Sequence, residues 1–227
     1  MPSNTYPLIA KEGWLVIGVL VFVTLVIKYL AGASAVFYFI PVVLLVTYLL
    51  RDPHRVIPSL PLALVSPAHG TVVDVKSIDD PWVSRKAKRI RLKMSVFDIY
   101  SLRSPIEGKV MNQWALRPCE EFPDRNFVLW IKTDEGDDIV METHLNIFTA
   151  LIFRFYIHSG ERIGQGQRCG FLYFGGLIDV WVPVNCKISV ESGQSVNSGS
   201  DILAYLVHTD EASSVTPVNQ PDGKAFA

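Results

Sequence analysis

The densest charge in the chain is a run of six cations within nine residues, and its spacing indicates a binding surface. The run consists of Arg85, Lys86, Lys88, Arg89, Arg91 and Lys93. The last three alternate with apolar residues, so a β-strand would place these cations on one face. Near an anionic membrane each cation contributes about 1 kcal/mol to binding. The run therefore predicts contact with lipid headgroups, and a solvated strand face is the alternative.

The cysteines and the overall charge argue against other kinds of chemistry. Cys119, Cys169 and Cys186 are odd in number and have neither metal-ligand spacing nor a C-x-x-C pair. We expect small buried thiols in a reducing compartment rather than disulfides. The formal net charge of −1 argues against a nucleic-acid partner, because such binding neutralises many phosphates.

The N-terminal apolar stretch is the element that could bring a membrane close. From Trp14 to Leu50 the ionisable side chains are Lys28 and the tyrosines, and one membrane helix needs only about 20 residues. Lys28 and a run of small residues divide the stretch into segments of about 14–30 and 35–50. We predict a transmembrane helical hairpin over residues 14–50. A cleaved signal peptide is the alternative, although the second apolar segment follows the small residues at once.

The charges beside this stretch predict its orientation. A hairpin places both of its ends on one side of the membrane. Its flanks carry Lys11 before it and Arg51, His54 and Arg55 after it, and positive flanks stay in the cytoplasm. We therefore expect a protein of the inner membrane whose remaining domain lies on the cytoplasmic side.

From about residue 63 the sequence indicates short strands separated by Gly and Pro. The expected strands are 71–76, 89–94, 109–115, 127–132, 138–143, 171–174, 179–182, 186–190 and 202–207. One helix is expected at about 145–156, where the apolar period changes. A polar tail without periodicity follows, and we expect residues 209–227 to be disordered.

Two internal repeats refine the fold class. The first is Ser66-Pro67-Ala68-His69-Gly70-Thr71-Val72, which resembles Ser104-Pro105-Ile106-Glu107-Gly108-Lys109-Val110. The second is a turn pattern with two glycines, found at 157–166 and 190–199. Both are typical of barrel-sandwich, or lipoyl-like, β units. We predict a mainly β (α+β) domain over 51–208, preceded by the hairpin and a flank at 1–13. A carrier lysine is not expected, because Lys93-Met94 lies inside a strand pattern.

Six segments occur in order along the chain: Lys11-Glu12-Gly13, Arg51-Asp52-Pro53-His54-Arg55-Val56, the S-P-A-D-G-like 66–70, the M-S-x-F-D-V-H-V-N-R-A-P-like 94–105, Arg125-Asn126, and 166–179, which is similar to G-E-R-F-G-L-I-R-F-G-S-R-x-D. Together they resemble the short bacterial, membrane-anchored form of phosphatidylserine decarboxylase. The resemblance implies a carboxy-lyase of phospholipid metabolism that converts phosphatidylserine to phosphatidylethanolamine. We add Arg103, in the fourth segment, to the candidates for headgroup binding.

The resemblance also implies a self-made cofactor, and here this sequence departs from the family. Members cut themselves between the Gly and Ser of the G-S pair, and the serine becomes a pyruvoyl group that serves as electron sink. An Asp–His pair assists that serine. The corresponding positions here are Gly176 for the serine, His69 for the aspartate and Tyr100 for the histidine. A missing base slows a reaction by about 10²–10⁴-fold, whereas a missing hydroxyl abolishes it. We predict a pseudoenzyme without the pyruvoyl group.

Further departures surround the same region. The family's A-R-R-I reads Ala150-Leu151-Ile152-Phe153 and its Q-I-A-G reads His144-Leu145-Asn146-Ile147, so we expect a reshaped cavity. If the family fold is kept, His69 and Tyr100 should lie near each other, and His144 could join them. A new metal or acid–base site and polar residues lining an old cavity both remain open.

Three functions are compatible with these observations. The first is a non-catalytic relative that binds membrane phospholipid, or pairs with itself or with an active decarboxylase and modulates it. The second is an active decarboxylase with unusual chemistry. The third is a membrane-tethered structural subunit. The cationic run and the resemblance favour the first.

Overall fold

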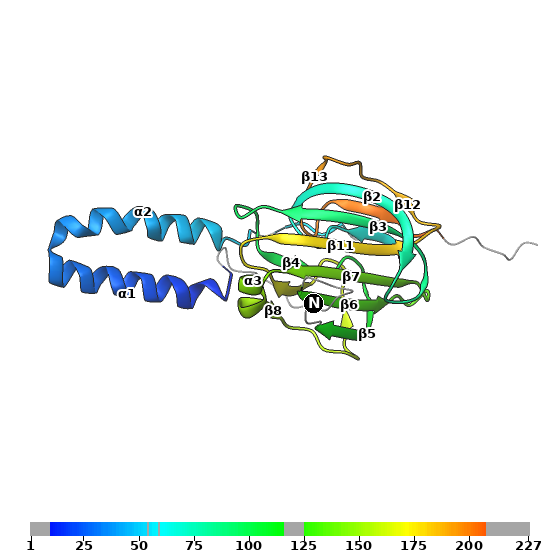
Figure 1. The fold of residues 1–227 in the computed structure, drawn as a ribbon, viewed down its shortest axis with the longest axis horizontal. Helices are drawn as coiled ribbons and strands as arrows, with labels where there is room; N and C mark the ends of the chain where they lie inside the picture. The colour runs from blue at the N-terminus through cyan, green and yellow to red at the C-terminus, as the bar shows by residue number, and fades with distance from the viewer. Residues whose placement is uncertain (1–9, 54, 59, 116–124, 208–227) are drawn as a thin grey trace, which may run out of the picture.

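The fold is mainly β, as the sequence predicts, with two long helices at its N-terminal end (Figure 1). The computed structural model describes residues 10–53, 55–58, 60–115 and 125–207. The predicted disordered tail at 209–227, most of the N-terminal flank and Cys119 lie outside these residues. The predicted domain boundaries stay predictions.

The two N-terminal helices, α1 (Gly13–Ala31) and α2 (Ala33–Leu49), lie side by side and project from one end of the β-rich part (Figure 1). They are joined at Gly32, whose φ of +85° glycine adopts without strain. Within the described residues, 13–30 are long and apolar enough to cross a membrane, and the apolar helix at 37–49 is shorter. An apolar helix thus indicates membrane anchoring, and the transmembrane hairpin remains a prediction.

The largest element of the β-rich part is a curled antiparallel sheet of eight strands in the order β13-β2-β3-β11-β7-β6-β5-β9 (Figure 1). Its strands are β13 (Ser195–Val196), β2 (Gly70–Asp80), β3 (Arg85–Met94), β11 (Gly176–Pro183), β7 (Asp138–Leu145), β6 (Arg125–Lys132), β5 (Gly108–Ala115) and β9 (Arg162–Ile163). The alternation predicted for β3 is confirmed, because Ile90, Leu92 and Met94 are buried. Arg89, Arg91 and Lys93 of β3 therefore lie on the outer face of the sheet.

Two smaller sheets pack against the same core. They have the orders β1-β14-β12 and β4-β10-β8. Their strands are β1 (Ala63–Val65), β14 (Ile202–Tyr205), β12 (Lys187–Ile188), β4 (Ser101–Arg103), β10 (Arg168–Phe171) and β8 (Arg154–Phe155). Leu64, Leu102 and Leu203 of these sheets join Ile90 and Leu92 of the large sheet in one apolar cluster. The lipoyl-like arrangement of these units stays a prediction.

Two expected elements differ from the structure. The predicted helix at 145–156 is the short α3 (Ile147–Ile152). The Asn146 side chain caps it by accepting the backbone N–H of Thr149 at 2.8 Å, and the chain becomes extended again at Phe153. The predicted strand at 171–174 is wrong: β10 ends at Phe171, and the next residues form the turn into β11.

Buried ion pairs join the two ends of the helix pair to the β-rich part. Asp52, just after α2, accepts a hydrogen bond from Ser101 Oγ at 2.9 Å and lies 3.7 Å from Arg103 Nη2 and 3.5 Å from Arg168 Nη1. Glu12, just before α1, pairs with Arg168 Nη2 at 2.5 Å. Asp52 and Arg103 are almost completely buried. We call Glu12, Asp52, Arg103 and Arg168 the anchor network.

Candidate functional site

The position expected for the family's serine begins strand β11. Gly176 pairs with Met94 at the end of β3. The two residues before it, Phe174 and Gly175, have φ values of +62° and +74°. A Cβ on Gly175 would lie 2.6 Å from the carbonyl oxygen of Met94, so a glycine is required there. Phe174 has no such freedom, and a bulky residue in this conformation costs about 1–3 kcal/mol. The turn before Gly176 is therefore both tight and strained.

Within the described segment 173–184, no side chain replaces the missing nucleophile. Gly176 carries no side-chain oxygen or sulfur, and the sequence from Tyr173 to Val184 has no Ser, Thr or Cys. Cys169 is completely buried in β10, and burial raises the pKa of its thiol to about 12. A protonated thiol is a poor nucleophile. The residues at the expected scission point thus do not fit the pyruvoyl group, which has to be made from a serine.

His69 and Tyr100 both contact the loop that follows β3. His69 Nε2 lies 3.7 Å from Asp98 Oδ1, and its Nδ1 lies 3.0 Å from the carbonyl oxygen of Val196. The Tyr100 hydroxyl donates to the carbonyl of Val96 at 2.5 Å. Burial raises the pKa of Tyr100, so its hydroxyl stays protonated and cannot act as a base near neutral pH. His144 does not join them, because it contacts Asp179 on the outer face of the sheet.

Two cavities border the turn before Gly176. An apolar cavity of about 370 Å³ lies between the base of the helix pair and the β-rich part. It is lined by Val16, Val46, Leu49, Leu50, Tyr100, Ile152, Arg154, Tyr173 and Phe174. A more polar cavity of about 260 Å³ is lined by Lys93, Met94, His144, Leu145, Asn146, Thr149 and the segment 175–177. The segment from Phe174 to Gly176 thus contributes to an apolar cavity on one side and to a polar one on the other.

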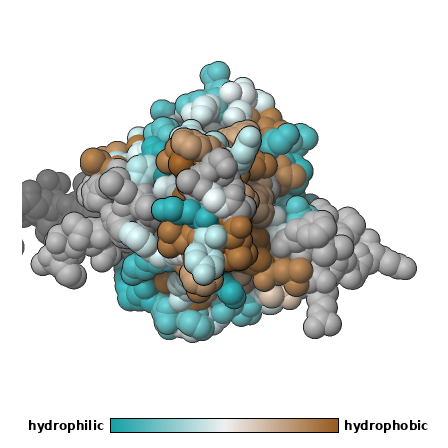
Figure 2. Space-filling view, turned by 90° about the vertical axis from the view of Figure 1, so that its left-hand side faces the viewer, coloured by the Kyte–Doolittle hydropathy of each residue, from teal (hydrophilic) through white to brown (hydrophobic). Residues whose placement is uncertain are grey.

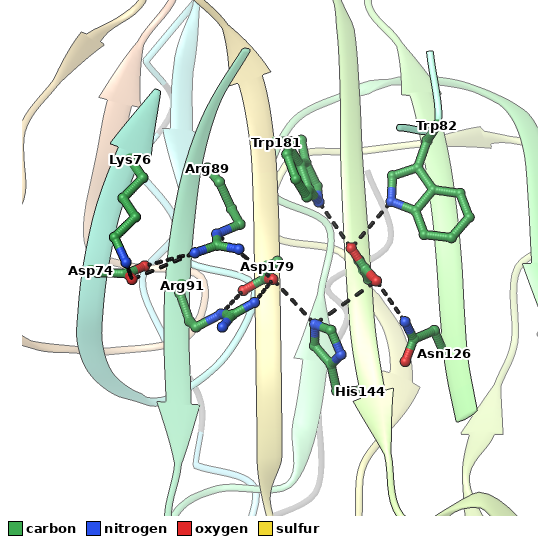
Figure 3. A network of polar contacts seen from close by, with 10 residues as sticks. Asp74, Lys76, Trp82, Arg89, Arg91, Asn126, His144, Asp179 and Trp181 are labelled. Carbon is green, nitrogen blue, oxygen red and sulfur yellow. Dashed lines mark hydrogen bonds and ion pairs between the residues drawn. The ribbon is translucent and has the colours of Figure 1, made fainter. Parts of the chain in front are cut away.

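A ladder of charged and polar side chains crosses the outer face of the large sheet (Figure 3). Arg91 of β3 makes two hydrogen bonds to Asp179 of β11, at 2.7 and 2.5 Å, and His144 of β7 contacts the same carboxylate at 3.1 Å. Glu142 accepts hydrogen bonds from the indoles of Trp82 and Trp181, both at 3.1 Å.

Glu142, His144 and Asp179 lie close enough to hold a cation between them. Their oxygens are nonetheless occupied by nitrogen donors: Arg91 on Asp179, and two indoles and the amide of Asn126, at 2.7 Å, on Glu142. Buried carboxylates are stable when such donors satisfy them. The ladder is therefore a cross-strand charge network that needs no added ion for balance.

Comparison with known proteins decides the family. The family model for phosphatidylserine decarboxylase matches residues 42–204. The chain belongs to the phosphatidylserine decarboxylase family.

The similarity to relatives extends over almost the whole chain. The phosphatidylserine decarboxylase proenzyme of Nitrosomonas europaea is 34% identical and covers 89% of this chain and 97% of its own. Those of Nitrosomonas eutropha and Aromatoleum aromaticum are 36% and 34% identical, covering 88% and 90% of this chain and 95% and 99% of their own. Among solved structures, glucose permease IIA from Mycoplasma capricolum covers 63% of this chain and 94% of its own, with a TM-score of 0.41 and 15% identity, which is too distant to inform the fold. The relatives link this homologue to phospholipid metabolism.

The structure shows which residues of the predicted cationic run have partners and which are exposed. Arg89 and Arg91 contact Asp74 and Asp179, Arg85 lies 3.5 Å from Asp80, and Lys88 donates to the carbonyl of Cys186 at 2.7 Å. Lys86 and Lys93 are exposed, at opposite ends of the strand. Arg103 is 2% exposed and belongs to the anchor network. Most of the run therefore makes contacts within the protein, and headgroup binding by the run stays a prediction.

The ladder predicts how stability changes in acid. Burial alone would raise the pKa of Asp179, but hydrogen bonds from Arg91 and His144 outweigh it and lower that pKa. A carboxyl with a lowered pKa stabilises the fold above its unfolded pKa of about 3.9 and loses this effect as the pH falls further. We expect Asp179→Asn to lower the melting temperature most at pH 5 and above, with a difference that shrinks toward pH 2. Thermal scans of both proteins across this range provide the test, and a constant difference would contradict it.

Proposed function

We propose that this homologue is a non-catalytic member of its family that remains one uncut polypeptide and holds a phospholipid at the membrane surface. The observation that carries the proposal is the glycine at position 176, which offers no atom to attack the preceding carbonyl. The buried, protonated thiol of Cys169 and the protonated hydroxyl of Tyr100 support it. Without cleavage there is no pyruvoyl group, and the family's decarboxylation has no electron sink.

The two cavities beside the turn support lipid binding. Small-molecule sites are concave and largely apolar, with a few polar groups that fix orientation. The apolar cavity suits part of an acyl chain, because both helices and the aromatic side chains of Tyr100 and Phe174 line it. The polar cavity offers Lys93 and His144 to a headgroup. A phospholipid lying across the Phe174–Gly176 segment would place its acyl chain in the apolar cavity and its charged headgroup in the polar cavity.

The orientation of the strands limits which cations can reach a membrane. In Figure 1 the strands of the large sheet run in roughly the same direction as α1 and α2. If the helix pair enters a bilayer, Arg85 lies about 26 Å farther from it than Lys93, at about 3.3 Å per residue. This distance exceeds the Debye length of about 8 Å at physiological salt. We therefore assign headgroup contact within the run to its Lys93 end.

The proposal extends to the membrane side on which the β-rich part lies and to the protein's partners. We further propose that the β-rich part lies on the cytoplasmic side of the inner membrane, because the helix pair is flanked by the positively charged residues Lys11 and Arg51. A homologue that binds the family's lipid without converting it would act on an active decarboxylase by holding or presenting lipid, or by pairing with it. Co-purification with an active relative tests this partner directly.

Lipid retention in the apolar cavity is testable with two matched variants of α2. Val46 lines the cavity, whereas Val42, one turn earlier, is exposed and does not. We expect Val46→Trp to fill the cavity and weaken phospholipid binding about tenfold, which corresponds to about 1.4 kcal/mol. Val42→Trp should leave binding unchanged. Native mass spectrometry of protein reconstituted with phosphatidylserine measures the bound fraction, and equal retention by both variants would contradict the placement.

A further inference from the structure

We infer that the end of the β-rich part from which the helices project is itself a membrane-docking surface, and that the loop after β3 inserts apolar side chains into the bilayer interface. We call Val96, Phe97, Leu151 and Phe174 the apolar rim. The inference rests on the proposed membrane anchoring and adds a second point of contact that the helices do not supply.

The rim is exposed although its residues are apolar. The exposed fractions are 45% for Val96, 61% for Phe97, 71% for Leu151 and 53% for Phe174. Single exposed apolar residues are ordinary on a protein surface, but a group of them marks a contact surface. Because these four come from three separate segments, local sequence alone does not gather them.

Contacts with the helix pair place the rim around its base. Arg51, directly after α2, donates to the carbonyl of Phe97 at 3.2 Å. Phe174 lines the apolar cavity together with Val46 and Leu50 of the helix pair, and Ile152, next to Leu151, lines the same cavity. Figure 2 views the molecule from the side on which the helices project, so the apolar helix pair lies in front of this face and hydrophilic residues surround the hydrophobic ones in the view.

The loop after β3 is built to present its tip. The backbone N–H of Ser95 donates to Asp98 Oδ2 at 2.6 Å, and the N–H of Asp98 donates to the carbonyl of Ser95 at 3.1 Å. These bonds close a turn with Val96 and Phe97 at its corner. The Asp98 carboxylate is occupied by Ser95 and by His69, 3.7 Å away. The acidic group of the loop therefore faces inward and leaves an apolar tip.

The charges around the rim fit a bilayer surface. Arg51, Lys93 and Arg154 lie beside it and carry the same sign. Arg51 also lies over the ring of Tyr48, 3.9 Å from its centroid. Cations and aromatic rings at the boundary between apolar and charged surface are typical of the membrane interface. A protein partner on this face would have to share it with the bilayer around α1 and α2, so we commit to an anionic bilayer as the occupant.

Site-specific labelling separates the rim from the helix anchor. Single cysteines replace Phe97, Leu151, Leu25 of α1 and Val184 in a full-length Cys119→Ser background, and each carries an environment-sensitive fluorophore. Val184, which is exposed, lies beyond the far end of β11. The proteins are reconstituted in vesicles of phosphatidylcholine and phosphatidylglycerol containing a lipid with a nitroxide near its headgroup. We expect quenching at 97 and 151 to be several-fold stronger than at 184, with 25 buried in the membrane.

Each outcome decides between the two points of contact. A membrane-buried label at 25, together with quenching at 97 and 151 but not at 184, supports the rim. A membrane-buried label at 25 with no quenching at 97 and 151 overturns the rim and leaves the helix anchor intact. Absence of lipid contact at all four positions overturns the anchor and the rim together. Equal quenching at 97 and 184 also overturns the rim, because contact would then not be specific to this face.

Discussion

A chain carrying Gly176→Ser, His69→Asp and Tyr100→His is expected to cut itself between residues 175 and 176, whereas the natural sequence stays whole. The family's cleavage needs a hydroxyl at 176 that attacks the carbonyl carbon of Gly175, and an Asp–His pair that takes the proton. The three substitutions restore these groups at the matching positions. Intact-mass analysis separates a full-length chain from fragments 1–175 and 176–227.

A serine restored at position 176 would be tightly enclosed. A Cβ on Gly176 would lie 3.2 Å from the carbonyl oxygen of His144 and 3.3 Å from the end of the Leu172 side chain. The flexible Leu172 side chain can move by the few tenths of an ångström required, and the His144 backbone has to shift by a similar amount. The preceding turn already holds Phe174 in a strained conformation, and positions 69 and 100 both contact the 96–98 loop. We therefore expect the fold to tolerate the change and the three groups to share one region.

Two controls make the cleavage result decisive. Gly176→Ala in the same background has a Cβ but no oxygen, and it should remain whole. Gly176→Ser alone should cut about 10²–10⁴-fold more slowly than the triple variant, because the general base is missing. Release of labelled CO₂ from phosphatidylserine should accompany cleavage and be absent without it. If the protein of natural sequence yielded two fragments, the second with a blocked N-terminus, the non-catalytic assignment would be overturned.

The strands could be predicted from the sequence because their signal is local. Alternation of cations with Ile90, Leu92 and Met94 identified β3 and the face that each residue occupies. The segment 171–174 carries the same apolar signal, but it forms a turn. Its geometry depends on Gly175 approaching the carbonyl of Met94, and that contact joins strands far apart in the chain. The periodicity of apolar residues carries no information about a contact between distant segments.

The charge networks could not be predicted for a related reason. Arg91, His144 and Asp179 meet only because β3, β11 and β7 are neighbours in the sheet. The sequence shows the cations of β3 but not the carboxylates opposite them, so a lipid-facing stripe and an ion-paired ladder have the same pattern. Arg103 is a second example, because its partner Asp52 is 51 residues earlier in the sequence and the pair forms only in the folded chain.

Asp52→Asn is expected to be the most destabilising conservative change in the anchor network. Asp52 and Arg103 are 1% and 2% exposed, and removing one charged partner from a buried ion pair costs about 3–5 kcal/mol because the buried cations lose part of their charge compensation. At about 2–4 °C per kcal/mol for a domain of this size, the melting temperature should fall by about 6–20 °C. Thermal scans of the full chain in detergent measure the shift. Asp134→Asn, which removes an exposed partner of Arg162, should give no measurable shift.

A second substitution distinguishes a lost charge pair from a general defect. Arg103→Met in the Asp52→Asn background removes one of the two cations that faced the lost carboxylate, and replacing both members of a buried pair is often neutral. The double variant should therefore melt higher than Asp52→Asn alone, and strictly additive losses would contradict the pairing. The network also fixes the helix pair against the wall of the apolar cavity, because Glu12 and Asp52 flank α1 and α2 while Arg103 and Arg168 belong to β4 and β10. If the cavity holds lipid, Asp52→Asn should lower lipid retention as well as stability, and the double variant should recover both in parallel.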